Sequence, residues 1–177
     1  PALIEGRGLA LSVERIPRPG PGLAVRVRLR NDGDQPVAVP SRFAFPRTVY
    51  FSLVRPGAEE QARVAVAQRA SGIRRSPLDE VGSRGVIHEG WTWNGDAFEG
   101  AHPRDLDARA LLAPGSALER TFDLSRLVLP DRTLGHGVWI LRAYWRNLES
   151  GRRLGMDPPL VTGLLVSDPI EIRGRNW

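Results

Sequence analysis

One stretch of eight residues constrains the fold of this chain more than any other. Residues 23–30 alternate an aliphatic residue with a small or basic one along their whole length. The aliphatic set is Leu23, Val25, Val27 and Leu29, and the set between them is Ala24, Arg26, Arg28 and Arg30. Because successive side chains of a β-strand point to opposite faces of a sheet, this strand has an apolar face and an arginine face. The pattern predicts an antiparallel sheet with one buried and one solvated face.

Strand patterns recur along most of the chain. Alternating apolar residues, or clustered β-branched and aromatic residues, occur at 9–16, 36–40, 48–54, 117–124 and 138–145, with a last strand or pair at 160–172. The sequence also holds 19 Gly and 15 Pro. Proline breaks helix interiors, so this composition favours turns over long helices. About seven to nine short strands at this spacing are typical of an all-β sandwich.

Regular strand spacing fails between residues 58 and 108. We predict a long irregular insertion there, within a single β-sandwich domain that spans residues 1–177. Residues 86–102 of the insertion have the pattern of a small hairpin with Asn94–Gly95 at its tip. Long irregular segments of compact domains are usually functional or mobile, so the insertion is a candidate contact surface.

Three stretches share features with a known group of domains. Residues 25–37 are a strand that ends at an asparagine, residues 112–124 contain a Pro-Gly-Ser turn that opens a strand, and residues 137–144 begin with a glycine followed by an aromatic residue. In these features the chain resembles bacterial immunoglobulin-like or fibronectin-III-like domains. It is also similar to the BsuPI-like intracellular proteinase inhibitor domain, whose Trp-rich hairpin matches Trp91, Trp93 and Phe98. The resemblance implies an immunoglobulin-like antiparallel β-sandwich, and it makes protease inhibition one candidate function.

Catalytic signatures are absent from the sequence. Because the chain has no cysteine, it has no disulfide, no thiolate metal site and no cysteine nucleophile. It also lacks the Gly-x-Ser-x-Gly elbow, the P-loop and the Gly-x-Gly-x-x-Gly turn. We therefore predict that the protein is not an enzyme, has no catalytic residues and needs no cofactor.

One polar cluster has the residue types of a metal site. Its members are His88, Glu89, Asp96, Glu99, His102, Asp105 and Asp107. Imidazole and carboxylate groups bind Zn²⁺ or Ca²⁺. The two histidines lack the HExxH spacing and the carboxylates lack calcium-loop spacing, so we interpret the segment as a solvated loop and predict no metal site.

Aromatic residues supply the first candidate contact site. Trp91 and Trp93 are separated by one residue, which places both rings on one face of a strand, and Phe98 follows shortly after. Such rings can contact a protein, stack on a sugar or cap the core. By contrast, Trp139 and Trp145 share a strand face with aliphatic residues, and we expect both in the core.

Arginine supplies the second candidate contact site. The chain has no lysine, so its 25 basic residues are all arginine, set against 20 acidic residues for a net charge of +5. Guanidinium groups bind phosphate and carboxylate, although codon use in a GC-rich genome would raise the arginine count equally well. The arginines form no dense block and are not interleaved with aromatics, so we predict no nucleic-acid binding. Arg26, Arg28 and Arg30 nevertheless form one exposed row, a second contact surface.

Trp177 and the lack of a long apolar run indicate how the chain could contact a membrane. Trp177 stands beside Arg173 and Arg175, which suits docking onto a partner or a membrane interface but equally suits a frayed tail. No apolar run approaches the ~18–20 residues that span a bilayer, so we predict membrane contact that is peripheral at most. No signal-like segment opens the sequence, and we expect a mature form in the periplasm or outside the cell.

These observations favour binding over catalysis. Our leading hypothesis is a non-enzymatic accessory or structural domain that mediates protein–protein contact within a larger assembly of the bacterial envelope. Its expected contact residues are Trp91, Trp93, Phe98, Arg26, Arg28, Arg30 and Trp177. Two alternatives stay open: a carbohydrate-binding module that uses the tryptophans at 91 and 93, and a protease inhibitor.

Overall fold

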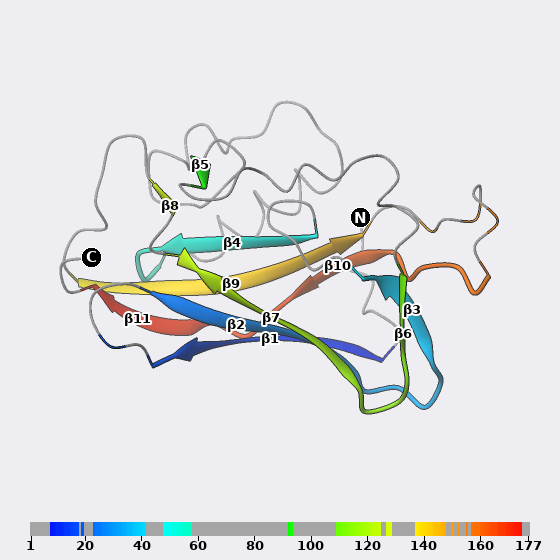
Figure 1. Cartoon of the computed structure of the whole chain (residues 1–177). Coiled ribbons are helices and arrows are strands. Elements are labelled where there is room, and N and C mark those ends of the chain that lie inside the picture. Colours follow the sequence, from blue (N-terminus) through cyan, green and yellow to red (C-terminus); the bar gives the residue numbers. More distant parts are fainter. Residues whose placement is uncertain are drawn as a thin grey trace.

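The computed structural model describes the strands and some of their connections. The described residues are 8–17, 19, 23–41, 48–57, 92–93, 109–124, 127–128, 137–147, 150, 152, 155 and 157–174. They form nine strands of four or more residues and two strands of two residues, all paired antiparallel (Figure 1). Within these residues there is no α-helix, and so none with the length and hydropathy that a membrane span requires. The prediction of an all-β, antiparallel fold is confirmed.

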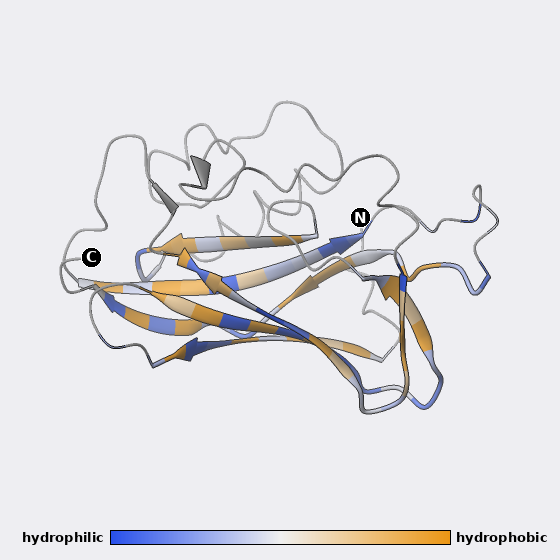
Figure 2. Ribbon diagram, viewed as in Figure 1, coloured by the Kyte–Doolittle hydropathy of each residue, from blue (hydrophilic) through white to orange (hydrophobic). Residues whose placement is uncertain are grey.

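The first sheet contains the strand predicted at residues 23–30. β2 (Ala24–Asn31) lies between β1 (Leu9–Ile16) and β7 (Ala117–Asp123). Its odd-numbered residues from Val25 to Leu29 are fully buried and its arginines are exposed, as the alternation predicts. Figure 2 shows this alternation of hydrophobic and hydrophilic residues along the strand.

The second sheet is centred on a longer strand. β9 (Gly137–Asn147) pairs along one edge with β4 (Val49–Val54). Along its other edge it pairs first with β11 (Ile170–Gly174) and then with β10 (Gly163–Val166). The sequence predicts a last strand or pair with a break at Asp168-Pro169, and the structure confirms the pair.

The break between β10 and β11 has a specific hydrogen-bonding cause. The amide of Ser167 donates to the carbonyl of Ala143 at 2.9 Å, as in a regular ladder. The amide of Ala143, however, donates to the Ser167 hydroxyl at 2.9 Å rather than to a backbone carbonyl. The hydroxyl therefore replaces one ladder acceptor, so the backbone can turn outward at Asp168-Pro169 without an unpaired buried amide.

Two short strand pairs complete the described structure. β3 (Val37–Pro40) pairs with β6 (Arg109–Leu112), and β5 (Thr92–Trp93) pairs with β8 (Leu127–Val128). β3 also makes a parallel bridge from Ala38 to Leu160 on its other edge. β6 was not predicted, because Arg-Ala-Leu-Leu has no period of two.

The buried faces of both large sheets contribute to one hydrophobic cluster. The rings of Phe51 from β4 and Phe122 from β7 meet edge to face, with centroids 5.2 Å apart and planes inclined at 73°. Leu141 and Ala143 of β9 are fully buried there, flanked by Trp139 and Trp145. The prediction that both tryptophans lie in the core is confirmed.

The start of β9 explains its glycine. Gly137 has a φ of +123°, a conformation that side chains disfavour, and a Cβ there would collide with the Arg55 guanidinium. That guanidinium lies 3.9 Å from the ring centroid of Trp139 and donates to the Val138 carbonyl. The glycine thus leaves room for a cation–π contact that covers the end of the core.

Candidate functional site

The outward face of the β1-β2-β7 sheet is the predicted contact surface that falls within the described residues. We call it the charged face, defined by Glu14, Arg26, Arg28, Arg30, Asp32 and Glu119. The three arginines lie in line on the central strand, about 7 Å from one to the next, because alternate residues of a strand share a face. The row predicted from sequence is therefore exposed and continuous.

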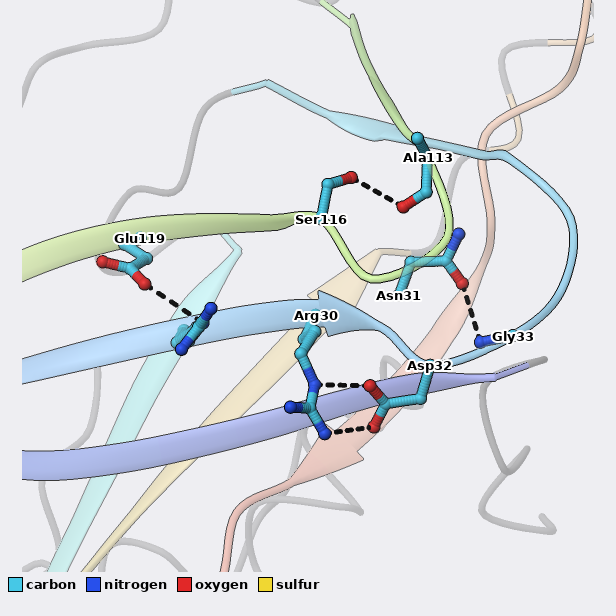
Figure 3. A network of polar contacts seen from close by, with 8 residues as sticks. Arg30, Asn31, Asp32, Gly33, Ala113, Ser116 and Glu119 are labelled. Carbon is cyan, nitrogen blue, oxygen red and sulfur yellow. Dashed lines mark hydrogen bonds and ion pairs between the residues drawn. The ribbon is translucent and has the colours of Figure 1, made fainter.

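Each arginine of the row pairs with a carboxylate, and the three carboxylates lie on β1, on β7 and directly after β2. Arg26 pairs with Glu14, directly opposite on β1, at 3.0 Å between Nη1 and Oε1. Arg28 pairs with Glu119, directly opposite on β7, at 3.0 Å between Nε and Oε1 (Figure 3). The side chains of these pairs are 43% to 63% exposed. In solvent such pairs contribute only about 0–1 kcal/mol each, so they orient the arginines more than they stabilise the fold.

The third pair is local and bidentate. Arg30 contacts both carboxylate oxygens of Asp32, two residues further on, with Nη2 donating to Oδ2 at 3.0 Å (Figure 3). The hydrogen bond and the negative charge of Asp32 raise the pKa of Arg30, which stays protonated at any physiological pH. Three guanidinium groups thus face three carboxylates, and the formal charges of these six residues cancel.

A buried asparagine fixes the end of the sheet where this pair lies. The side-chain amide nitrogen of Asn31 donates to the carbonyls of Gln35 and Leu112 at 2.8 and 2.9 Å. Its side-chain oxygen accepts from the Gly33 amide at 3.0 Å (Figure 3). Its backbone amide also donates to Ser116. Asn31 is fully buried, and these bonds tie the end of β2 to the turn before β7.

A glycine lets β1 approach the same corner. Gly8 has a φ of +69°, and an added Cβ would lie 2.5 Å from the Cα of Gly33. Its carbonyl accepts a hydrogen bond from the Asp32 amide. Only glycine combines this backbone conformation with so close an approach, so the corner that positions Asp32 is sterically defined.

The aromatic candidates are placed only in part. Trp93 lies in β5, where its register partner is Leu127 of β8. The expected hairpin around Asn94–Gly95 and the other predicted aromatic contacts fall outside the described residues, namely Trp91, Phe98 and Trp177. The two contact surfaces predicted from sequence are therefore not brought together by any described contact.

The cluster of histidines and acids also falls outside the described residues. Within the ranges given above, no group of three or more metal-binding side chains converges. The partners of the arginine row, Glu14, Asp32 and Glu119, were not predicted. The alternation of residues 9–16 places Glu14 on the same face as Ser12, so its exposure could be predicted. Its pairing with Arg26 could not, because contacts between residues distant in sequence set the register of the two strands.

Comparisons with known proteins add no family. No protein-family model matches the chain, and no curated protein matches it. The immunoglobulin-like and BsuPI-like resemblance therefore stays a prediction.

Proposed function

We propose that this chain is a non-enzymatic domain that binds another protein within a larger assembly, using the charged face as a contact surface. The observation that supports this most is the arrangement of both charge signs on one exposed, regular sheet face. A polyanion such as nucleic acid gains nothing from a face whose charges cancel. A protein surface with the opposite pattern of charges makes a favourable electrostatic contact at every position, which gives orientation and specificity.

The proposal includes the finer fold and the setting. We infer that the two large sheets pack as an immunoglobulin-like sandwich, which the shared hydrophobic cluster and the contact between Phe51 and Phe122 support. We further propose that the domain acts in the bacterial envelope, as a periplasmic or extracellular protein. Cell fractionation tests the location, and recovery only in the cytoplasm would contradict it.

Native purification tests the binding function directly. The untagged protein is isolated from its source cells and the co-migrating proteins are identified by mass spectrometry. We expect a defined partner in stoichiometric amount. Recovery of the chain alone as a monomer would contradict the proposal.

A charge swap then tests the face. The double change Arg28→Glu with Glu119→Arg keeps the ion pair within the chain but inverts the pattern offered to a partner. We expect the complex to weaken at least about tenfold while the free energy of unfolding changes little. The control is Arg173→Glu with Glu171→Arg, which inverts a more exposed pair on β11, 80% and 51% exposed, and should leave binding unchanged. Equal weakening by both swaps would exclude the charged face as the contact.

A further inference from the structure

The edge of β7 that faces away from β2 has no strand partner at Ala117, Glu119 and Thr121 among the residues that the structure describes. The amide of Leu124 donates to the Leu23 carbonyl, and the Ser116 carbonyl accepts from the Asn31 amide, so even-numbered residues here bond to β2. In an antiparallel ladder the residues between them point their amides and carbonyls the other way. In the described ranges no strand pairs with this outer edge, which is made by Ala117, Glu119 and Thr121. The edge adjoins the charged face, because Glu119 belongs to both.

The side chains of this edge oppose pairing with a second copy of the chain. Two copies of β7 could pair antiparallel in registers centred on residue 119, 120 or 121. The first register places Glu119 opposite Glu119, and the second places Arg120 opposite Arg120. The third places Glu119 of one copy opposite Asp123 of the other. Like charges directly opposite each other destabilise a strand pair. Arg120 also lies on the core side of the strand yet is exposed, with its guanidinium 5.4 Å from the Phe122 ring. A charge at such a position protects a sheet edge from self-association.

The same charges would favour a strand of opposite pattern. Backbone hydrogen bonds supply affinity at an open edge, and the side chains opposite the edge strand supply specificity. We propose that β7 accepts an extended segment of the partner protein as an added antiparallel strand, with an acidic residue opposite Arg120 and a basic residue opposite Glu119. This inference rests on the proposed protein-binding function and names the element and the kind of segment that it uses.

A designed peptide tests the edge without the natural partner. The probe is the capped peptide Thr-Val-Thr-Glu-Lys-Val-Thr, which in antiparallel register places Glu opposite Arg120 and Lys opposite Glu119. Its matched control is Thr-Val-Thr-Lys-Glu-Val-Thr, with the same composition and the two charges exchanged. Binding is followed on the full-length protein by amide hydrogen exchange at the residues of β7.

We expect the matched peptide to slow exchange at Ala117, Glu119 and Thr121, whose amides face the open edge. Leu118, whose amide already bonds to β2, should change little. Exchanging the two charges should weaken binding about tenfold, since two favourable cross-strand pairs become repulsive. Absence of protection with millimolar matched peptide, or equal binding of both peptides, would overturn the proposal.

A proline variant links the peptide to the natural assembly. Thr121→Pro removes an outward amide while leaving the ladder to β2 intact, because proline is tolerated on edge strands. We expect it to abolish peptide protection and to release the partner, with circular dichroism confirming that the fold remains. If wild type and Thr121→Pro retain the partner equally, the edge proposal fails and the binding function stands. If neither carries a partner, the proposed function itself fails, whatever the peptide does.

Discussion

The central strands of the two large sheets, β2 and β9, differ in how far their outward side chains are exposed to solvent. On β2 these residues are arginines that reach solvent and pair with carboxylates. On β9 the equivalent positions are half-buried or buried, and Tyr144 is completely buried against Leu164 and Val166. On β4 the outward residues Ser52 and Val54 are likewise only 1% and 2% exposed. One sheet therefore presents a face to solvent, and the other is buried on both faces where β4 and β9 meet.

The sequences of the two strands record this difference. β2 alternates from Val25 onward, as expected for a sheet with one solvated face, although Ala24, expected on the arginine face, is buried. β9 reads Gly-Val-Trp-Ile-Leu-Arg-Ala-Tyr-Trp-Arg-Asn, with two charges in eleven residues, as expected for a strand covered on both sides. Outward positions on β9 should therefore be intolerant of change, whereas those on β2 are available for binding. Substitutions at matched positions test this contrast.

The largest effect is expected at Tyr144. Tyr144→Ala removes a fully buried aromatic side chain and leaves a cavity on the outward side of β9. We expect a loss of about 3–5 kcal/mol in the free energy of unfolding, measured by urea denaturation. The matched change Arg28→Ala, also outward on a central strand, should cost less than about 1 kcal/mol. Similar losses at the two positions would refute the contrast between the sheets.

Asn31 should be the most sensitive polar residue of the first sheet. Asn31→Asp keeps the shape of the side chain. It replaces the amide nitrogen that donates to the carbonyls of Gln35 and Leu112 with a carboxylate oxygen, which cannot donate. We expect a loss of about 2–4 kcal/mol at pH 7, because a buried group loses its hydrogen bonds and gains a charge. The same denaturation measurement on Asp32→Asn, its exposed neighbour, provides the control, and a larger loss there would contradict the assignment.

A buried hydroxyl pair on the second sheet should have a smaller effect. The oxygens of Ser52 and Tyr144 lie 3.1 Å apart between β4 and β9. We expect Ser52→Ala and Tyr144→Phe each to cost about 1 kcal/mol, with the double variant well short of their sum. A double-mutant cycle in urea measures this coupling. Additive losses would mean that the two hydroxyls do not support each other.

Most of the strands could be predicted, because the alternation of apolar and polar residues along a strand shows which of its faces is buried. The strand expected at 9–16 has the bounds found for β1, and the pattern of residues 23–30 gave both faces of β2. β6 was missed because a four-residue strand without alternation is defined by its pairing with β3 rather than by its own residues. Much of the predicted insertion at 58–108 lies outside the described residues, apart from β5.

The candidate site was predictable on one strand only. The arginine row follows from residues that are adjacent in sequence, so its exposure could be predicted. Its partner Glu119 could not, because the register between β2 and β7 depends on core contacts such as that of Phe122 with Phe51. For the same reason the covered outward face of Tyr144 was not predicted: it depends on Leu164 and Val166, which follow in a later strand.

The smallest effect should come from the charged face itself. Arg28 and Glu119 are 47% and 43% exposed, so water solvates both when either is removed. We expect Arg28→Ala, Glu119→Ala and their combination to stay within about 1 kcal/mol of wild type, with a coupling energy that falls further in 1 M NaCl. Urea denaturation at low and high salt measures both quantities. A coupling energy above about 2 kcal/mol that persists in salt would show that the pair stabilises the sheet. The charged face would then be structural, and its arginines could not be exchanged for binding without loss of the fold. A small, screened coupling leaves the arginines free to change partners, as a contact surface for another protein requires.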